Sequence, residues 1–286
     1  MEEMQPTHNK EQLEKRELVA FTPARSEKYV DALLRGLRGQ AQQSGYAITI
    51  FENEFDQAQQ NEQVEKYLES GELPGGWIWW PVNQEAALPT LRKLADTAVP
   101  VLQINQLPNE AEAALVFAFV GPDDRLRARN AAEMMIEARD KLAANSHKFA
   151  SKGGNAIAVT YPKTYGGYSL CMAAFKEAIA ASGIQLIGET NPGFGAEKGF
   201  AGVASLIGQI QDLGIDFIYG MDDALLQGGI KALEQAGYQV GKDVIAVGTV
   251  GNGDRQLLKT GKQYATTLQS PLLEGQLAVQ VADAYL

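Results

Sequence analysis

Short apolar runs alternate with longer amphipathic stretches along this 286-residue chain. A strand covered on both faces reads as a short apolar run, whereas a surface helix repeats apolar residues every three or four positions. Residues 28–43 follow the helical repeat, with Val30, Leu33, Leu34 and Leu37 on one face. Five runs in the first part of the chain read as strands: 17–21, 47–51, 76–80, 99–105 and 115–121. This alternation predicts a parallel sheet with helices on both faces.

Two further helices are predicted between the strands of this first part. The segment 61–71 carries helical spacing, and Gly71 marks its end. The next helix runs around Leu88, Leu91 and Leu94. Because proline is tolerated where the helical N–H groups have no partner, we expect Pro89 to lie in the first turn of that helix.

The same succession of strands and helices is repeated in the second half of the chain. Its strands are predicted at 155–162, 184–189, 216–220 and 243–250. Matching the halves element by element gives a nearly constant separation along the chain for three pairs of strand residues: Ile48 with Gln185, Ile78 with Ile218, and Val101 with Ile245. The sequence therefore predicts two similar, doubly wound α/β domains rather than one large sheet.

The segments that directly follow the strands are rich in Asn, Asp, Gln and aromatic residues. Open parallel sheets bind ligands beyond the carboxyl ends of their strands, and two such domains in tandem predict a site in the cleft between them. Amides and carboxylates hydrogen-bond to hydroxyl groups, while aromatic rings pack on C–H faces. A neutral polyhydroxylated ligand, such as a carbohydrate, matches both. The segments are 23–29, 51–55, 80–83, 105–106, 123–124, 161–168, 191–194, 222–223, 249–252 and Gln269.

All three tryptophans lie within the stretch GGWIWWPVN, residues 75–83. Side chains alternate between the faces of a strand, so Trp77 and Trp79 point one way and Trp80 the other. We expect Trp77 and Trp79 in the core, because both faces of a parallel strand are covered. Trp80 precedes Pro81, which ends the strand. It is therefore predicted at the carboxyl edge, as a candidate wall of the ligand site.

Several of the polar and aromatic candidates also fit a structural role. Asp123 and Asp222 each precede a predicted helix, so either carboxylate fits as an N-cap, a role compatible with ligand binding. The tyrosine-rich segment TYPKTYGGYS, residues 160–169, fits either surface packing or a binding site. We expect one of its tyrosines, Tyr165, at the site.

Composition and charge narrow the classes of function. Hydrophobic residues make up 45% of the chain and charged residues 21%, as in globular proteins, and no apolar run approaches the roughly 20 residues that span a bilayer. The net charge of −10 argues against a nucleic-acid partner. Cys171 is the only cysteine, and the chain has just two histidines. No nucleophile–base pair, metal-ligand spacing or nucleotide-binding glycine motif is present in the sequence, so neither catalysis nor a cofactor is predicted.

From about Glu17 onward the chain resembles the type I periplasmic solute-binding proteins of ABC transporters, in the ribose- and galactose-binding group, which also includes the autoinducer-2 receptor. The resemblance lies in the order and spacing of five fragments: WPVNQEAALPTLRKLADTAVPVLQIN, FVGPDDRLRARNAAEMM, AAFKEAIAASGIQLIGE, IYGMDDALLQGGIKALEQAG and VGTVGNGDRQLLKTGKQYATTLQSPLLEGQLAV.

The resemblance implies a set of ligand-binding positions. Tyr29 falls near the family's stacking aromatic residue, Asn105 falls where ligand hydroxyls are bound, and Gln106 stands where an arginine is common. Four more residues fall on family ligand positions: Asp123, Phe194, Asp222 and Gln269. The chain also departs from the family. The arginine usual in the first helix of the second domain aligns with Ser169 or Cys171, and an aspartate common after a later strand aligns with Val250. These departures favour a ligand other than an ordinary pentose or hexose.

The resemblance also implies how the chain is divided. One domain would comprise residues 17–121 and 270–286, the other residues 122–269, with a polar leader at 1–16. The chain would cross between them near 121–124 and 268–271, and the family's third crossing would fall after Leu286.

The implied function is capture of a small polar ligand, a sugar or polyol, by hinge closure, and its delivery to an ABC permease. The implied protein is a monomer in the periplasm, its signal peptide removed. The alternatives are a receptor that serves a histidine kinase, the effector-binding core of a LacI-type repressor, and an enzyme that uses the cleft. Only sixteen residues precede the strand at 17–21, too few for the repressor's DNA-binding domain.

Overall fold

The computed structural model describes residues 16–25 and 28–286. Contacts divide the chain into two compact units. Domain 1 comprises the residues up to Pro122 together with Ser270–Leu286, and domain 2 is Asp123–Gln269. Except for Arg16, the predicted polar leader lies outside the described residues.

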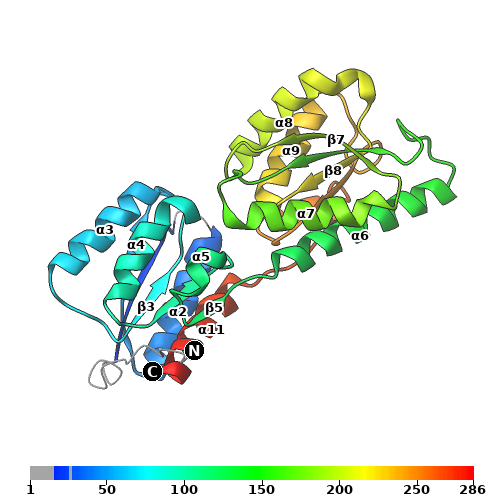
Figure 1. Ribbon diagram of the computed structural model, residues 1–286. Coiled ribbons are helices and arrows are strands. Elements are labelled where there is room, and N and C mark those ends of the chain that lie inside the picture. The colour runs from blue at the N-terminus through cyan, green and yellow to red at the C-terminus, as the bar shows by residue number, and fades with distance from the viewer. Residues whose placement is uncertain (1–15, 26–27) are drawn as a thin grey trace, which may run out of the picture. The chain divides into compact units, whose positions relative to one another are not determined.

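Domain 1 is a parallel five-stranded sheet with the strand order β2-β1-β3-β4-β5. Helices cover both of its faces, as predicted (Figure 1). Its elements are β1 (Glu17–Pro23), α2 (Lys28–Ser44), β2 (Ala47–Asn53), α3 (Gln57–Glu69), β3 (Gly76–Trp79), α4 (Gln84–Asp96), β4 (Val101–Ile104), α5 (Glu110–Ala113), β5 (Ala118–Val120) and α11 (Pro271–Tyr285).

Domain 2 is a second parallel five-stranded sheet, with the order β10-β9-β8-β6-β7. Its elements are α6 (Asp124–Ala144), β6 (Asn155–Val159), α7 (Gly166–Ala180), β7 (Gln185–Thr190), α8 (Ala196–Ile210), the 3-10 helix η1 (Gln211–Leu213), β8 (Phe217–Gly220), α9 (Asp223–Gln235), β9 (Ile245–Gly248), α10 (Arg255–Lys259) and β10 (Ala265–Thr266).

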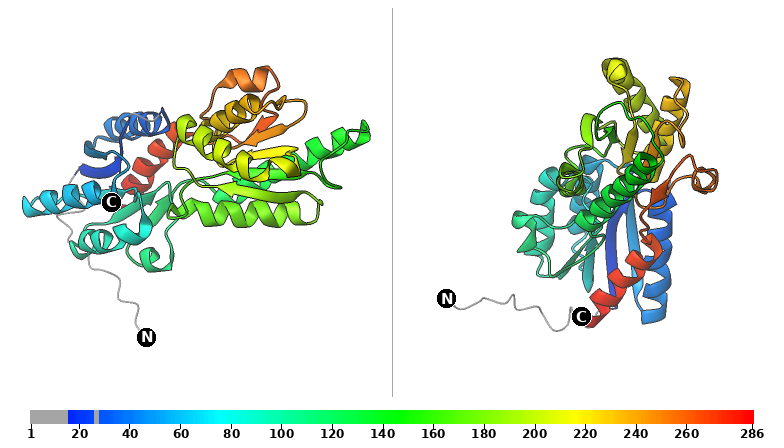
Figure 2. Two further views of the ribbon diagram at one scale, coloured as in Figure 1. Left: turned by 90° about the horizontal axis from the view of Figure 1, so that it is seen from above. Right: turned by 90° about the vertical axis from the view of Figure 1, so that its right-hand side faces the viewer.

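The two sheets have the same topology when β6 to β10 are matched in order with β1 to β5. The predicted duplication and fold class are therefore confirmed. The sequence did not predict β10, because a strand of two residues leaves no periodic pattern. The helix after each fifth strand belongs to the other domain. Helix α6 follows β5 but packs beside α7, and α11 follows β10 but packs beside α2 (Figure 2). We call α6 and α11 the crossover helices.

Trp77 and Trp79 of β3 lie on one face of the sheet and Trp80, which directly follows the strand, lies on the other, as the alternation predicts. Trp77 and Trp79 are fully buried in the cluster that includes Leu91 and Leu94 of α4. The indole N–H of Trp77 donates to Thr97 Oγ1 at 3.1 Å. Trp80 lies in the other cluster, with residues of α2 and α11. The prediction that Trp77 and Trp79 are core residues is confirmed.

Helix α4 begins earlier than the sequence suggested. Its N-cap is Asn83, whose side chain accepts from the backbone N–H of Ala86 at 3.2 Å. Pro89 consequently lies in the second turn, and the prediction of a first-turn proline was wrong. A proline there removes one helical hydrogen bond, to the carbonyl of Glu85. Both residues are exposed, so water can satisfy that carbonyl.

Helices α2 and α11 approach each other closely where each has a glycine. A Cβ on Gly36 would lie 2.2 Å from the carbonyl oxygen of Leu272, and one on Gly275 would lie 2.2 Å from that of Leu33. A larger residue at either position would force the helices apart. The close crossing holds Glu274, which precedes Gly275, beside the first turn of α2.

Candidate functional site

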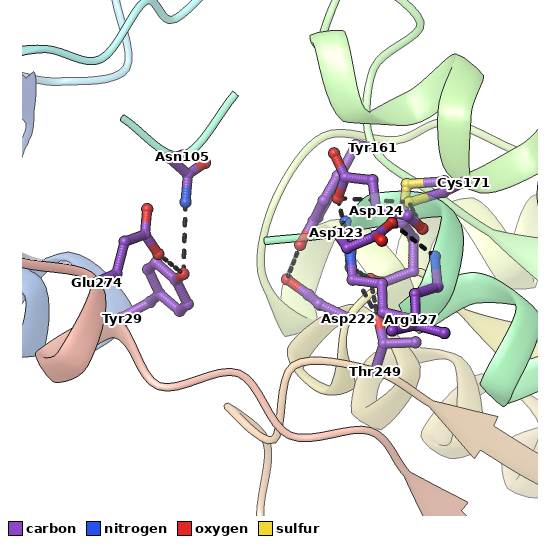
Figure 3. A network of polar contacts seen from close by, with 12 residues as sticks. Tyr29, Asn105, Asp123, Asp124, Arg127, Tyr161, Cys171, Asp222, Thr249 and Glu274 are labelled. Atoms are coloured by element: carbon purple, nitrogen blue, oxygen red, sulfur yellow. Dashed lines mark hydrogen bonds and ion pairs between the residues drawn. The ribbon is translucent and has the colours of Figure 1, made fainter. Parts of the chain in front are cut away.

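In domain 1, three side chains at the carboxyl edge of the sheet form a hydrogen-bonded chain (Figure 3, left). The hydroxyl of Tyr29, in the first turn of α2, donates to Glu274 Oε2 at 2.5 Å. Asn105 Nδ2 donates to the same hydroxyl at 3.4 Å. The phenol therefore serves as donor and acceptor at once, and it links the segment after β4 to the start of α11.

Asn105 and Gln106 follow β4 directly. Asn105 has a φ of 66°, in the left-handed region that asparagine tolerates better than most residues, and its backbone N–H donates to Val120 at 3.0 Å. This turn places its side chain beside Tyr29. Gln106 is fully buried, and its Nε2 donates to the carbonyl of Pro81. Gln106 thus ties the end of β4 to the end of β3.

Trp80 lies behind Tyr29 rather than on the surface. Its side chain is 3% exposed, and the two rings meet edge to face with centroids 6.2 Å apart. Such pairs stabilise beyond their buried area. Trp80 therefore fixes the ring of Tyr29, and direct contact between Trp80 and a ligand stays a prediction.

In domain 2, three aromatic rings gather where β6 and β7 end. Tyr161, Tyr165 and Phe194 lie with ring centroids 5.1 to 5.4 Å apart. At this spacing the rings pack on one another and leave no space for a group between them. Tyr161 is buried, while Tyr165 and Phe194 are half-buried and form the outer part of the cluster. The third tyrosine of this segment, Tyr168, is not part of the cluster and donates instead to Glu189.

Asp222 is the N-cap of α9, as the sequence suggested. Its Oδ1 accepts from the backbone N–H of Leu225 at 2.6 Å. Its Oδ2 accepts from the Tyr161 hydroxyl at 3.2 Å and from Asn252 Nδ2 at 3.3 Å. Burial raises the pKa of this carboxyl, and these hydrogen bonds partly oppose the rise. A carboxylate offers about four acceptor positions, so three bonds leave Asp222 room for a ligand donor.

The remaining predicted residues lie where the chain crosses between the domains. Asp123 is exposed and caps α6 by accepting from the backbone N–H of Leu126 at 2.9 Å. Gln269 is half-buried, and its backbone N–H donates to the carbonyl of Val250 at 3.2 Å. Val250 has a φ of 81°, which a β-branched residue rarely adopts.

The sequence did not predict two charged residues at the carboxyl edges of the sheets: Glu274 in domain 1 and Arg127 in domain 2. Arg127 is on α6, and its Nε pairs with Asp124 Oδ1 at 2.7 Å (Figure 3, right). In the sequence, the run RLRAR looks like a solvated helix face, and Glu274 lies too far after a strand to be noticed. Within the described part of the chain, no group of His, Cys, Asp and Glu side chains is arranged to hold a metal ion. No helix in the same part is long and apolar enough to cross a membrane.

Residues 19–286 match the family described as "Periplasmic binding protein domain". The chain belongs to this family. The family expected from the sequence is thereby confirmed. Proteins of this class bind solutes and are not enzymes.

Known members of the family are related to this chain at low sequence identity. A D-ribose/D-allose-binding protein of Pseudomonas aeruginosa is 23% identical over 233 residues, which cover 80% of this chain and 68% of the relative. A Mycobacterium smegmatis protein solved in complex with β-D-fucofuranose is 18% identical, with a TM-score of 0.80 over 94% of this chain and 86% of that one. The myo-inositol-binding protein of Caulobacter is 17% identical, with the same TM-score and the same coverage of both chains. At these identities the solved structures establish a shared fold.

Proposed function

We propose that this protein captures a sugar or polyol in the periplasm and delivers it to an ABC permease. It acts as a monomer and carries out no chemistry on its ligand. Asn105 and Tyr29 of domain 1 contribute one set of contacts, supported by Trp80 and by the fully buried Gln106. Domain 2 contributes the outer aromatic rings and Asp222, with Asp123 and Gln269 at the crossings.

The observation that carries the proposal is the pairing of acceptors with aromatic faces at the carboxyl edge. In domain 2, the half-buried rings of Phe194 and Tyr165 pack on Tyr161, whose hydroxyl donates to Asp222. Asp222 has room for one more donor. In domain 1, the amide of Asn105 and the phenol of Tyr29 lie side by side, hydrogen-bonded to each other at 3.4 Å, at the carboxyl edge of the sheet. Sugars combine hydroxyl donors with apolar C–H faces, and several relatives carry sugar or polyol names.

Delivery requires a difference between the free and the loaded protein. A ligand that contacts both domains favours the arrangement in which both sets of contacts are made. Closure by a hinge at the two crossings would produce that arrangement and give a permease a surface to recognise.

Calorimetric titration with D-ribose, D-allose, L-arabinose, D-fucose and myo-inositol tests the proposal. We expect saturable one-to-one binding of at least one compound, and about tenfold or greater weakening in Phe194→Ala and Asp222→Asn. Lys242→Ala, a change at an exposed position of domain 2, is the matched control. An absence of heat with these compounds, other polyols and amino acids would contradict the proposal, and conversion of the bound compound would indicate an enzyme.

A further inference from the structure

Arg127 is a nearly buried arginine at the carboxyl edge of domain 2. It is the fourth residue of α6, and its side chain is 9% exposed. Its Nη1 donates to the carbonyl of Met221 and to Thr249 Oγ1, both at 2.9 Å. Met221 directly follows β8 and Thr249 directly follows β9. The guanidinium therefore joins the carboxyl ends of β8 and β9. Asp222, the N-cap of α9, directly follows Met221 at the end of β8.

One nitrogen of this guanidinium has no acceptor within the described part of the chain. Nε is used by Asp124 and Nη1 by Met221 and Thr249, but Nη2 donates to none of the described residues. Nη2 is not fully enclosed by protein atoms. The small exposed part of this side chain therefore includes a donor that a ligand can reach. An arginine whose only task was to join the strand ends would not need that donor exposed.

The groups around Arg127 define what this donor can bind. Its Cζ lies 5.9 Å from the centroid of the Tyr161 ring, and the hydroxyl of the same tyrosine donates to Asp222. Arg127 and Asp222 therefore lie beside the same tyrosine, Arg127 at its ring and Asp222 at its hydroxyl. The positive charge of Arg127 is balanced by Asp124 at 2.7 Å, so Nη2 supplies a hydrogen bond without adding net charge.

We propose that Arg127 is a ligand-binding residue that selects for two adjacent hydroxyl groups. One ligand hydroxyl accepts from Nη2, and its neighbour donates to the remaining acceptor position of Asp222. A neutral vicinal diol satisfies both groups, whereas an anion would meet the carboxylate of Asp222. This inference rests on the proposed function. It identifies the vicinal diol as the part of the sugar or polyol that domain 2 recognises.

Arg127 also bears on the missing arginine of α7, the family position that aligns with Ser169 or Cys171 in this sequence. Neither Ser169 nor Cys171 supplies a guanidinium from α7, and α6 supplies one instead. Cys171 is buried against the partner of that guanidinium: its Sγ lies 3.4 Å from the carbonyl oxygen of Asp124 and 3.7 Å from Oδ1. A Cβ on Gly167 would lie 2.7 Å from Asp124 Oδ2, so the small residue there leaves room for the carboxylate.

Titration of wild-type and Arg127→Lys protein with D-ribose and with 2-deoxy- and 3-deoxy-D-ribose tests the inference. A lysine keeps the charge but loses the fork. We expect Arg127→Lys to weaken D-ribose binding by about 10- to 100-fold, and to weaken binding of the analogue that lacks the contacted hydroxyl much less. Arg125→Lys, on the exposed side of the same helix, should change neither. Unchanged D-ribose binding in Arg127→Lys, or equal losses for all three sugars, would overturn the inference.

A crystal structure of the ligand-free wild type decides the case in which none of these sugars binds. An absence of binding would count against the proposed function but not against the role of Arg127. An ordered water within hydrogen-bonding distance of Nη2 would support the inference, because it marks the place of a ligand oxygen. A protein acceptor on Nη2 would overturn it. Thermal melts of Arg127→Lys and Arg127→Met identify any loss of binding that comes from unfolding.

Discussion

Glu274 and Arg127 occupy the same position in the two crossover helices. Each is the fourth residue of its helix, α11 or α6, and each reaches the carboxyl edge of the sheet that its helix joins. Glu274 accepts from Tyr29 in domain 1, whereas Arg127 donates to Met221 and Thr249 in domain 2. The duplicated fold thus carries opposite charges at equivalent sites, which gives the two edges different hydrogen-bonding character.

Removing the Tyr29 hydroxyl tests the chain of hydrogen bonds in domain 1. We expect Tyr29→Phe to lower the free energy of unfolding by about 1–3 kcal/mol, because a buried carboxylate loses a donor. Urea denaturation measures the change. Tyr238→Phe is the control, since the Tyr238 hydroxyl makes no hydrogen bond with a described residue. Equal stabilities of Tyr29→Phe and wild type would mean that this bond contributes nothing.

Substitutions of Trp77 and Trp80 should differ in their effect on ligand binding. Trp77→Ala should lower the free energy of unfolding by about 3–5 kcal/mol, because Trp77 is fully buried and donates to Thr97. Trp80→Ala should also weaken ligand binding, because Trp80 fixes the ring of Tyr29. Denaturation and calorimetry on both variants check this. Equal affinity in folded Trp80→Ala and wild type would return Trp80 to a purely structural role.

The pH dependence of stability should show the buried carboxyl of Asp223. Burial raises its pKa to about 6, although Thr266 and Gln263 donate to it. The folded state then binds the proton more tightly than the unfolded state. The stabilising contribution of the protonated form is complete below the unfolded pKa of about 4 and is lost as the pH rises through 6.

Replacing Asp223 with asparagine removes this titration. Relative to wild type, Asp223→Asn should gain about 2–3 kcal/mol of stability between pH 4 and pH 7. Urea denaturation at several pH values gives the difference, and Asp212→Asn at an exposed position is the control. A difference that does not change with pH would show that Asp223 titrates as it does in the unfolded chain.

Cys171 should be unreactive in the folded protein. It is the only cysteine of the chain, it is fully buried, and burial raises the pKa of its thiol to about 12. Ellman's reagent should therefore react with one thiol in denaturant and with almost none under native conditions. Rapid reaction of the native protein would show that the packing of α7 against Asp124 opens readily.

The sequence predicted the fold far better than the site. The duplication and all β-strands except β10 follow from local periodicity, and Trp77, Trp79 and Trp80 lie on the predicted faces of the sheet. The rule that ligands bind after parallel strands selects Asn105 and Asp222. It cannot select Glu274 or Arg127, because each reaches the sheet edge from inside a helix. Their positions depend on how closely the crossover helices pack, and the Gly36–Gly275 contact that sets this in domain 1 joins residues far apart in the chain.

The most direct test of the central claim is a crystal structure of the protein with the ligand that it retains through purification, or with a sugar that binds in calorimetry. We predict one sugar or polyol that contacts both Asn105 of domain 1 and Asp222 of domain 2, with an aromatic ring of domain 2 against its C–H face. A ligand bound elsewhere, or one that leaves both Asn105 and Asp222 without contact, would contradict the proposed function.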